Sequence, residues 1–177
     1  MFQGIKDKFK HKSGLKFLRE ELKKPFADVA RSKGITSIAC LVDLDKFENP
    51  NLFYEFVEDF GLRPNAVKII GYKSYYDKNS PYSTPVFSDK DLGWNGSIEN
   101  SYVLEFLSRE YDMLVNYYTE ENLLLQIMSV KTRARIRVGF KEVDAKYNDL
   151  ILDTPIKNFN TFKQELKKYL KVLNEIK

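Results

Sequence analysis

Two acidic side chains stand where the first apolar segment of the chain ends. Residues 35–43 form a near-continuous apolar run rich in strand formers, which is typical of a strand covered on both faces. Asp43 and Asp45 lie at its carboxyl end, where parallel sheets bind their ligands. Two carboxylates at this spacing can share a Mg²⁺ ion, because Mg²⁺ takes oxygen ligands from carboxylates and phosphates. A magnesium-dependent enzyme acting on a phosphorylated or nucleotide substrate is therefore one interpretation.

The Asp-Leu-Asp sequence resembles the nucleophile motif of haloacid-dehalogenase-type phosphatases, in which an apolar strand ends in Asp-x-Asp. Thr119 and Asp153 also end apolar segments, roughly where that family keeps a Thr and further acids. Lys46 and Phe47, however, replace the small turn residues that are usual there. No lysine or acidic pair completes the set, and acids at strand ends commonly cap the next helix. Capping therefore stays open as the alternative to metal binding.

Cations at alternate positions form the sharpest basic signal in the chain. In an extended segment, a spacing of two places such side chains on one face, which suits phosphates or an acidic partner. The alternative is an exposed edge strand that charge protects from pairing with other chains. The four cations are Lys131, Arg133, Arg135 and Arg137.

Positive charge is concentrated near the two ends of the sequence. Residues 1–24 carry a net charge of +5 and residues 157–177 a net charge of +4, which leaves −5 for residues 25–156. This separation favours contact with a polyanion through the basic segments. Alternatively, the lysines only keep two surface helices soluble. The candidate anion contacts in the first segment are Lys6, Lys8, Lys10 and Lys12.

An aromatic-rich segment, residues 73–96, is expected to be a long ordered loop with one short strand. Exposed rings beside lysines are a common way to grip single-stranded nucleic acid or a partner loop. The alternative is that the loop folds back and buries its rings, since large aromatics bury much apolar area. The candidate binding rings are Tyr75, Tyr76, Tyr82 and Trp94.

Several classes of function are excluded by what the sequence lacks. The single cysteine and single histidine exclude an internal disulfide, a cysteine-rich zinc site and most histidine-based catalysis. Neither a dinucleotide-binding fingerprint nor a Walker motif occurs, so no cofactor is expected apart from magnesium under the first interpretation. No signal peptide and no apolar run approaching the ~20 residues of a membrane span is visible. We therefore expect a cytoplasmic protein.

Apolar runs alternate with amphipathic segments, which predicts an α/β fold. We expect a three-layer, Rossmann-like domain over residues 25–177, with a mainly parallel sheet, helices on both faces and an antiparallel edge hairpin. A basic amphipathic segment, residues 1–24, precedes it. The expected strands are 35–43, 66–72, 111–118, 135–140 and 149–153, the last two joined as the hairpin, and the expected helices are 13–24, 50–60, 97–107 capped by Ser97, one opened by Thr119, and 160–176.

The segment from Val138 to Pro155, VGFKEVDAKYNDLILDTP, precedes a lysine-rich terminal helix. Together with the basic start that leads to Gly34 and an apolar strand, it resembles a family of short uncharacterised bacterial α/β proteins. The resemblance covers most of the chain and its motifs are structural. It implies no assigned activity, so no functional residue is carried over.

The absence of a catalytic set and the segregated charge favour a non-catalytic module. It would bind an acidic macromolecule or partner complex, such as RNA, a ribosome or a membrane-associated assembly, through its basic termini. A third hypothesis uses residues 1–24 as a docking helix for another protein. A peripheral membrane contact is open as well, although Gly4 and the pair Ser13-Gly14 weaken a continuous amphipathic helix. The oligomeric state is not indicated.

Overall fold

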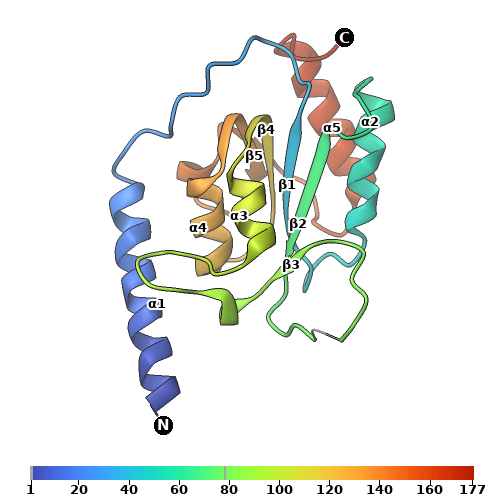
Figure 1. The fold of residues 1–177 in the computed structure, drawn as a ribbon. Coiled ribbons are helices and arrows are strands. Elements are labelled where there is room, and N and C mark those ends of the chain that lie inside the picture. Colours follow the sequence, from blue (N-terminus) through green and yellow to red (C-terminus); the bar gives the residue numbers. More distant parts are fainter. Residues whose placement is uncertain (1, 78) are drawn as a thin grey trace.

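A six-stranded parallel sheet forms the centre of the molecule (Figure 1). The computed structural model describes residues 2–77 and 79–177. The strands lie in the order β3-β2-β1-β4-β5-β6, and every neighbouring pair is parallel. The chain adds β2 and β3 on one side of β1 and then adds the later strands on the other side, as in Rossmann-like sheets. The strands are β1 Ile38–Asp43, β2 Val67–Tyr72, β3 Val86–Phe87, β4 Glu110–Tyr117, β5 Arg133–Phe140 and β6 Leu150–Leu152.

Helices cover both faces of this sheet, which confirms the predicted α/β fold class. α3 and α4 lie on one face and α2 and α5 on the other, while α1 packs outside α4 (Figure 1). Within the described residues, no helix is long and apolar enough to cross a bilayer. The helices are α1 Phe2–Glu21, α2 Glu55–Asp59, α3 Ser101–Leu107, α4 Leu123–Lys131 and α5 Phe159–Val172, with short 3-10 segments η1 Pro50–Tyr54, η2 Asp89–Asp91 and η3 Ala145–Tyr147.

β1 is buried along its whole length because it lies in the middle of the sheet. Ala39 and Leu41 belong to the core under α3 and α4, whereas Ile38, Cys40 and Val42 belong to the core under α2 and α5. This alternation follows from the period of two in a strand. Cys40 is buried in this core, and burial raises the pKa of its thiol. The reactive thiolate form is therefore disfavoured.

The predicted antiparallel hairpin at the end of the sheet is wrong. β6 runs parallel to β5, with Val138 opposite Leu150. The polar connection makes a 3-10 turn that buries Tyr147, and it carries the chain back to begin a new strand beside β5. Asp149 anchors this return, since its carboxylate and its N–H bond to the backbone N–H and carbonyl oxygen of Arg137. A tight turn was expected because the connection is short and polar, but the connection crosses back along the sheet, so that β6 begins at the same end as β5.

α1 is one uninterrupted helix, so the prediction that it begins near Ser13 is wrong. Gly4 and Gly14 both lie inside it. Gly14 is buried against α4, where a Cβ atom would lie 3.2 Å from Leu123 Cδ2. The close approach of the two helices offsets the intrinsic helical penalty of glycine. Gly4 has no neighbouring atom within 4 Å of its Cβ position and lies on the open part of the helix.

Two predicted helix caps are also corrected. Asn100, not Ser97, caps α3, and its side chain accepts a hydrogen bond from the second residue of the helix at 3.0 Å. Asn122, not Thr119, caps α4 and accepts from the third helical residue at 3.0 Å. Asparagine, serine and threonine all satisfy free N–H groups at this position. Several capping residues occur close together before each helix, and the tertiary contacts select among them.

Candidate anion-binding surface on helix α1

The carboxyl-terminal half of α1 is docked on the body of the protein. Leu18 is buried against α4, and the ring of Phe17 lies under the ammonium group of Lys131 at 5.0 Å. The Ser13 hydroxyl accepts a hydrogen bond from the N–H of Asn95 at 3.1 Å. Gly96 follows with a positive φ of 73°, and a Cβ atom there would lie 2.3 Å from the Phe17 ring. The loop before α3 therefore needs glycine to receive α1.

The amino-terminal half of α1, residues 2–12, extends past the end of the sheet at which the strands terminate (Figure 1). Lys6, Lys8 and Lys12 are exposed and Lys10 is half-buried. None of the four forms an ion pair with any residue that the structure describes. By contrast, the two acids near the other end of α1 pair with lysines three residues away. The four predicted lysines are thus displayed together on one projecting helix.

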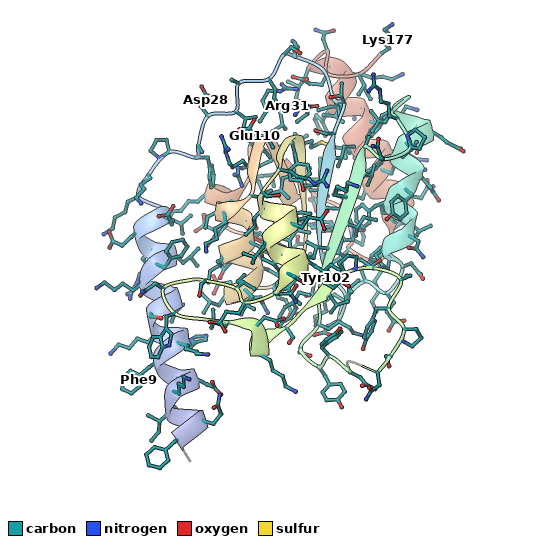
Figure 2. The ribbon with its side chains drawn as sticks, viewed as in Figure 1. Phe9, Asp28, Arg31, Tyr102, Glu110 and Lys177 are labelled. Carbon is teal, nitrogen blue, oxygen red and sulfur yellow. The ribbon has the colours of Figure 1, made fainter. Side chains whose placement is uncertain are left out.

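Three apolar side chains are exposed on the same half of α1. Phe2 is 89% exposed, Ile5 50% and Phe9 57%. Their spacing of three and four residues aligns them along one side of the helix. Figure 2 shows Phe9 on the side of α1 that faces away from the sheet. Lys16, which is also exposed, continues along the same side of the helix. We call Phe2, Ile5 and Phe9 the apolar stripe.

A groove of about 760 Å³ separates the projecting half of α1 from the body. Its walls carry both signs of charge, because the lining includes Lys10 and Lys90 as well as Asp89 and Glu121. Asp7, the one acid of this half, also lines the groove and accepts a hydrogen bond from its neighbour Gln3. The mixed lining gives the groove no preference for an anion. Of the four lysines of this half, only Lys10 is among the residues that line the groove.

The structure does not gather the cations of segment 131–137 on one face. Ala134 belongs to the core under α3 and α4, whereas Ile136 packs against the core under α2 and α5. A regular strand would keep these two side chains on the same face, so the alternation breaks between them. Arg133 is half exposed and pairs with Glu110 of the neighbouring strand β4. The four cations therefore do not form the predicted stripe. The first of them, Lys131, contacts the Phe17 ring of α1.

Arg135 forms an ion pair with Glu175 behind the end of α5. The two side chains are mostly buried and meet at 2.7 Å and 2.8 Å through two guanidinium nitrogens. The same carboxylate accepts a hydrogen bond from the N–H of Gly34 at 2.8 Å. The hydrogen bonds from Arg135 lower the pKa of Glu175, against the opposing effect of burial. This pair closes the segment before β1 onto the carboxyl-terminal end of the chain.

Arg137 is buried inside the protein. Its guanidinium donates to the backbone carbonyl oxygens of Ser129 and Thr132 at the end of α4. Its other face is covered by the Phe26 ring, whose centroid is 3.7 Å away. Burial lowers the pKa of Arg137 to about 10. Arg137 therefore neutralises a helix carboxyl end and fixes the segment that follows α1.

The side chains of Asp43 and Asp45 accept hydrogen bonds from backbone N–H groups at the end of β1. The Asp43 carboxylate accepts the N–H of Asp45, and the Asp45 carboxylate accepts the N–H of Ser74, both at 3.0 Å. Burial raises the pKa of Asp43, which disfavours its charged form. Across the described residues, no group of three or more His, Cys, Asp or Glu is placed to hold a metal ion. A Mg²⁺ ion held by Asp43 and Asp45 stays a prediction, because Mg²⁺ commonly takes only one or two carboxylates together with phosphate oxygens.

The four rings predicted for binding lie in two places. Tyr75, at 74% exposure, is close in sequence to Tyr76 and Tyr82, whose ring centroids are 5.3 Å apart. Lys73 lies over the Tyr82 ring at 5.6 Å. Trp94 is 47% exposed and sits in the separate turn that receives α1. The loop is thus partly folded back, and it does not present the four rings as one surface.

The second basic segment of the sequence lies away from the first. Residues 157–177 contain α5, and Lys177 is at the opposite end of the molecule from the amino terminus of α1 (Figures 1 and 2). Lys163 is also committed to internal pairs with Glu55 and Asp59. The two basic segments therefore cannot act as one compact anion site.

Comparison with known proteins identifies a family. The model described as "Family of unknown function (DUF6913)" matches residues 10–173. The chain belongs to this family. No curated protein and no solved structure matches it. The predicted membership of an uncharacterised family is thereby confirmed.

The DUF6913 match covers the whole sheet and the docked half of α1, and it begins inside the projecting half. Sequence reasoning selected the lysines of that half but missed the exposure of Phe2, Ile5 and Phe9. Their spacing of three and four residues is visible in the sequence. The spacing alone does not show that α1 is longer than the surface against which it packs.

Proposed function

We propose that the protein is a cytoplasmic, non-catalytic binding module that attaches to an acidic macromolecular surface through the projecting half of α1. The observation that carries this proposal is the set of lysines on that half, which are exposed or half-buried and unpaired among the described residues. Residues 2–12 contain four lysines and one aspartate, a net charge of +3 with His11 neutral. Such a cluster attracts polyanions, and the attraction weakens with ionic strength.

The fold supports this assignment because it supplies a rigid base for the helix. Gly14, Phe17 and Leu18 pack the docked half against α4 and the turn before α3. The projecting half is therefore held at a fixed angle to the body. The arginines of β5, in contrast, are satisfied internally, so they add little to an external contact. The binding surface proposed here consists of Lys6, Lys8, Lys10 and Lys12.

Retention on immobilised heparin, a generic polyanion, tests the proposal. The parent chain should elute at higher salt than the variant Lys6→Gln/Lys8→Gln/Lys12→Gln, because three of the attracting charges are gone. The matched control removes the same charge at the other end of the molecule, with Lys168→Gln/Lys171→Gln/Lys177→Gln. It should elute much closer to the parent. Equal elution of the two triple variants would overturn the proposal.

A further inference from the structure

We infer that the partner of the projecting helix is an anionic lipid surface, on which α1 lies in the plane of the headgroups. The inference rests on the proposed function and names its partner. Two properties of one helix segment carry it together. These are the unpaired lysines and the apolar stripe of Phe2, Ile5 and Phe9.

The apolar stripe distinguishes a membrane from a nucleic acid. Single-stranded RNA can stack its bases on rings such as Phe2 and Phe9, but its phosphates and sugars offer no apolar medium for an aliphatic side chain such as Ile5. A bilayer interface accepts both kinds of group, because apolar side chains enter the acyl boundary while lysines reach the lipid phosphates. The exposure of Phe2, at 89%, is the largest among the large hydrophobic side chains of the described residues. Contact with a partly apolar surface would remove the Phe2 side chain from water.

The arrangement around the helix axis suits this orientation. At 3.6 residues per turn, Phe2, Ile5 and Phe9 share one side, with Lys6 on one flank and Lys8 and Lys12 on the other, within roughly a quarter turn. A helix lying with the stripe downward therefore carries cations along both edges. Their alkyl chains are long enough to extend toward headgroups from this position. The outer side of α1, where Figure 2 shows Phe9, faces away from the sheet.

Helix continuity removes the main objection from the sequence. Gly4 and Gly14 do not break α1, which runs from Phe2 to Glu21. Gly14 is occupied by packing on α4, while Gly4 lies in open space on the projecting half. The stripe spans about two turns, so the attachment should be reversible and depend on both apolar and ionic terms. Neutral lipid should therefore bind the protein much more weakly than anionic lipid.

Vesicle flotation of the full chain tests the inference. The probes are vesicles of equal parts phosphatidylcholine and phosphatidylglycerol, and vesicles of phosphatidylcholine alone. The parent should float with the anionic vesicles. Phe2→Ala/Ile5→Ala/Phe9→Ala should weaken this binding on the order of 100-fold, since each large apolar group contributes several-fold on insertion. Lys6→Gln/Lys8→Gln/Lys12→Gln should weaken it by a similar factor, roughly fivefold for each lysine.

A matched control removes apolar groups that are exposed elsewhere. Tyr102, Leu104 and Val172 are 54%, 63% and 73% exposed and lie on α3 and α5. Replacing these three with alanine should leave flotation unchanged. Alanine preserves helix propensity at every substituted position, and circular dichroism checks that helix content is retained.

The outcomes separate the inference from the proposed function. If the apolar variant floats like the parent, or if the parent does not float, the lipid inference is overturned. Heparin retention that still depends on the α1 lysines would then leave the broader proposal standing and point to RNA or an acidic protein. If heparin retention is insensitive to those lysines as well, both fail.

Discussion

Lysines occupy alternate positions in the projecting half of α1, and cations occupy alternate positions from the end of α4 into β5. In α1 the spacing of two distributes the lysines around the part of the helix that extends beyond its packing surface. In β5 the cations meet acceptors: Arg133 meets Glu110, Arg135 meets Glu175, and Arg137 meets the carbonyls that end α4. The same spacing of charge therefore leaves cations without partners among the described residues in one region and gives them internal partners in the other.

The difference follows from what surrounds each segment. β5 lies between β4 and β6 and beneath helices, so a long cationic side chain there finds acids and carbonyl oxygens nearby. The projecting half of α1 has solvent on its outer side and a groove of mixed charge on its inner side. An unpaired cation costs little free energy where water solvates it and much more where it is buried. Burial, rather than charge spacing, decides which cations remain available.

The largest expected effect is on folding stability at Arg137. Arg137→Ala should lower the free energy of unfolding by about 3 kcal/mol, because it leaves two buried carbonyl oxygens without donors and a cavity beside Phe26. Urea denaturation measures this loss. Lys8→Ala on the projecting helix is the control and should change stability by less than about 0.5 kcal/mol. A similar loss in both variants would remove the contrast between the regions.

A somewhat smaller loss is expected where α1 docks. Gly96→Ala should lower stability by about 2 kcal/mol, because alanine is strained at a φ of 73° and its Cβ would meet the Phe17 ring. Gly4→Ala is the matched control on the open part of α1, where it should be neutral or slightly stabilising. Thermal unfolding of both variants separates the docked half from the projecting half. Equal stability of the two would argue against the docking contact.

The ion pair of β5 should make stability depend on pH. The pKa of Glu175 is lowered by Arg135, so the pair contributes stability above the ordinary glutamate value of 4.5. That contribution is lost as pH falls through the lower folded-state pKa. Glu175→Gln should therefore cost about 1.5 kcal/mol at neutral pH and progressively less in acid. A difference between parent and variant that stays constant from neutral pH into strong acid would contradict this account.

The smallest effect on stability is expected for the lysines of α1. Lys6→Gln/Lys8→Gln/Lys12→Gln should unfold within about 0.5 kcal/mol of the parent, because these side chains have no partner among the described residues. The same denaturation measurement used for Arg137 gives the value. A loss comparable to that of Arg137→Ala would show that these lysines have a structural role.

The sequence predicted the fold class because strong apolar runs coincide with the central strands. The run at residues 35–43 contains β1, and the predicted strands at 66–72 and 111–118 match β2 and β4 to within a residue or so. The predicted hairpin is wrong because the short polar connection, in which Tyr147 is buried, returns the chain to start β6 parallel to β5. The local pattern of a strand does not show in which direction it runs relative to its neighbour.

The candidate site was predicted in part. The lysines of α1 were selected from charge alone, and the structure shows them without partners among the described residues. Arg137 was selected on the same grounds, yet it is buried, because Phe26 and the end of α4 are brought to it only by tertiary folding. Asp43 and Asp45 were correctly placed at the carboxyl end of β1, where they bond to backbone N–H groups. The spacing of residues in the sequence does not show which side chains will be buried or which partners they will find.

Amide hydrogen exchange of the full chain tests the central claim most directly, with and without vesicles of equal parts phosphatidylcholine and phosphatidylglycerol. The account predicts that vesicles slow exchange in residues 2–12 and leave residues 133–140 of β5 unchanged. The projecting helix turns should gain protection when their outer side meets lipid. Slowed exchange in β5 without any change in residues 2–12, or no change anywhere, would contradict the claim.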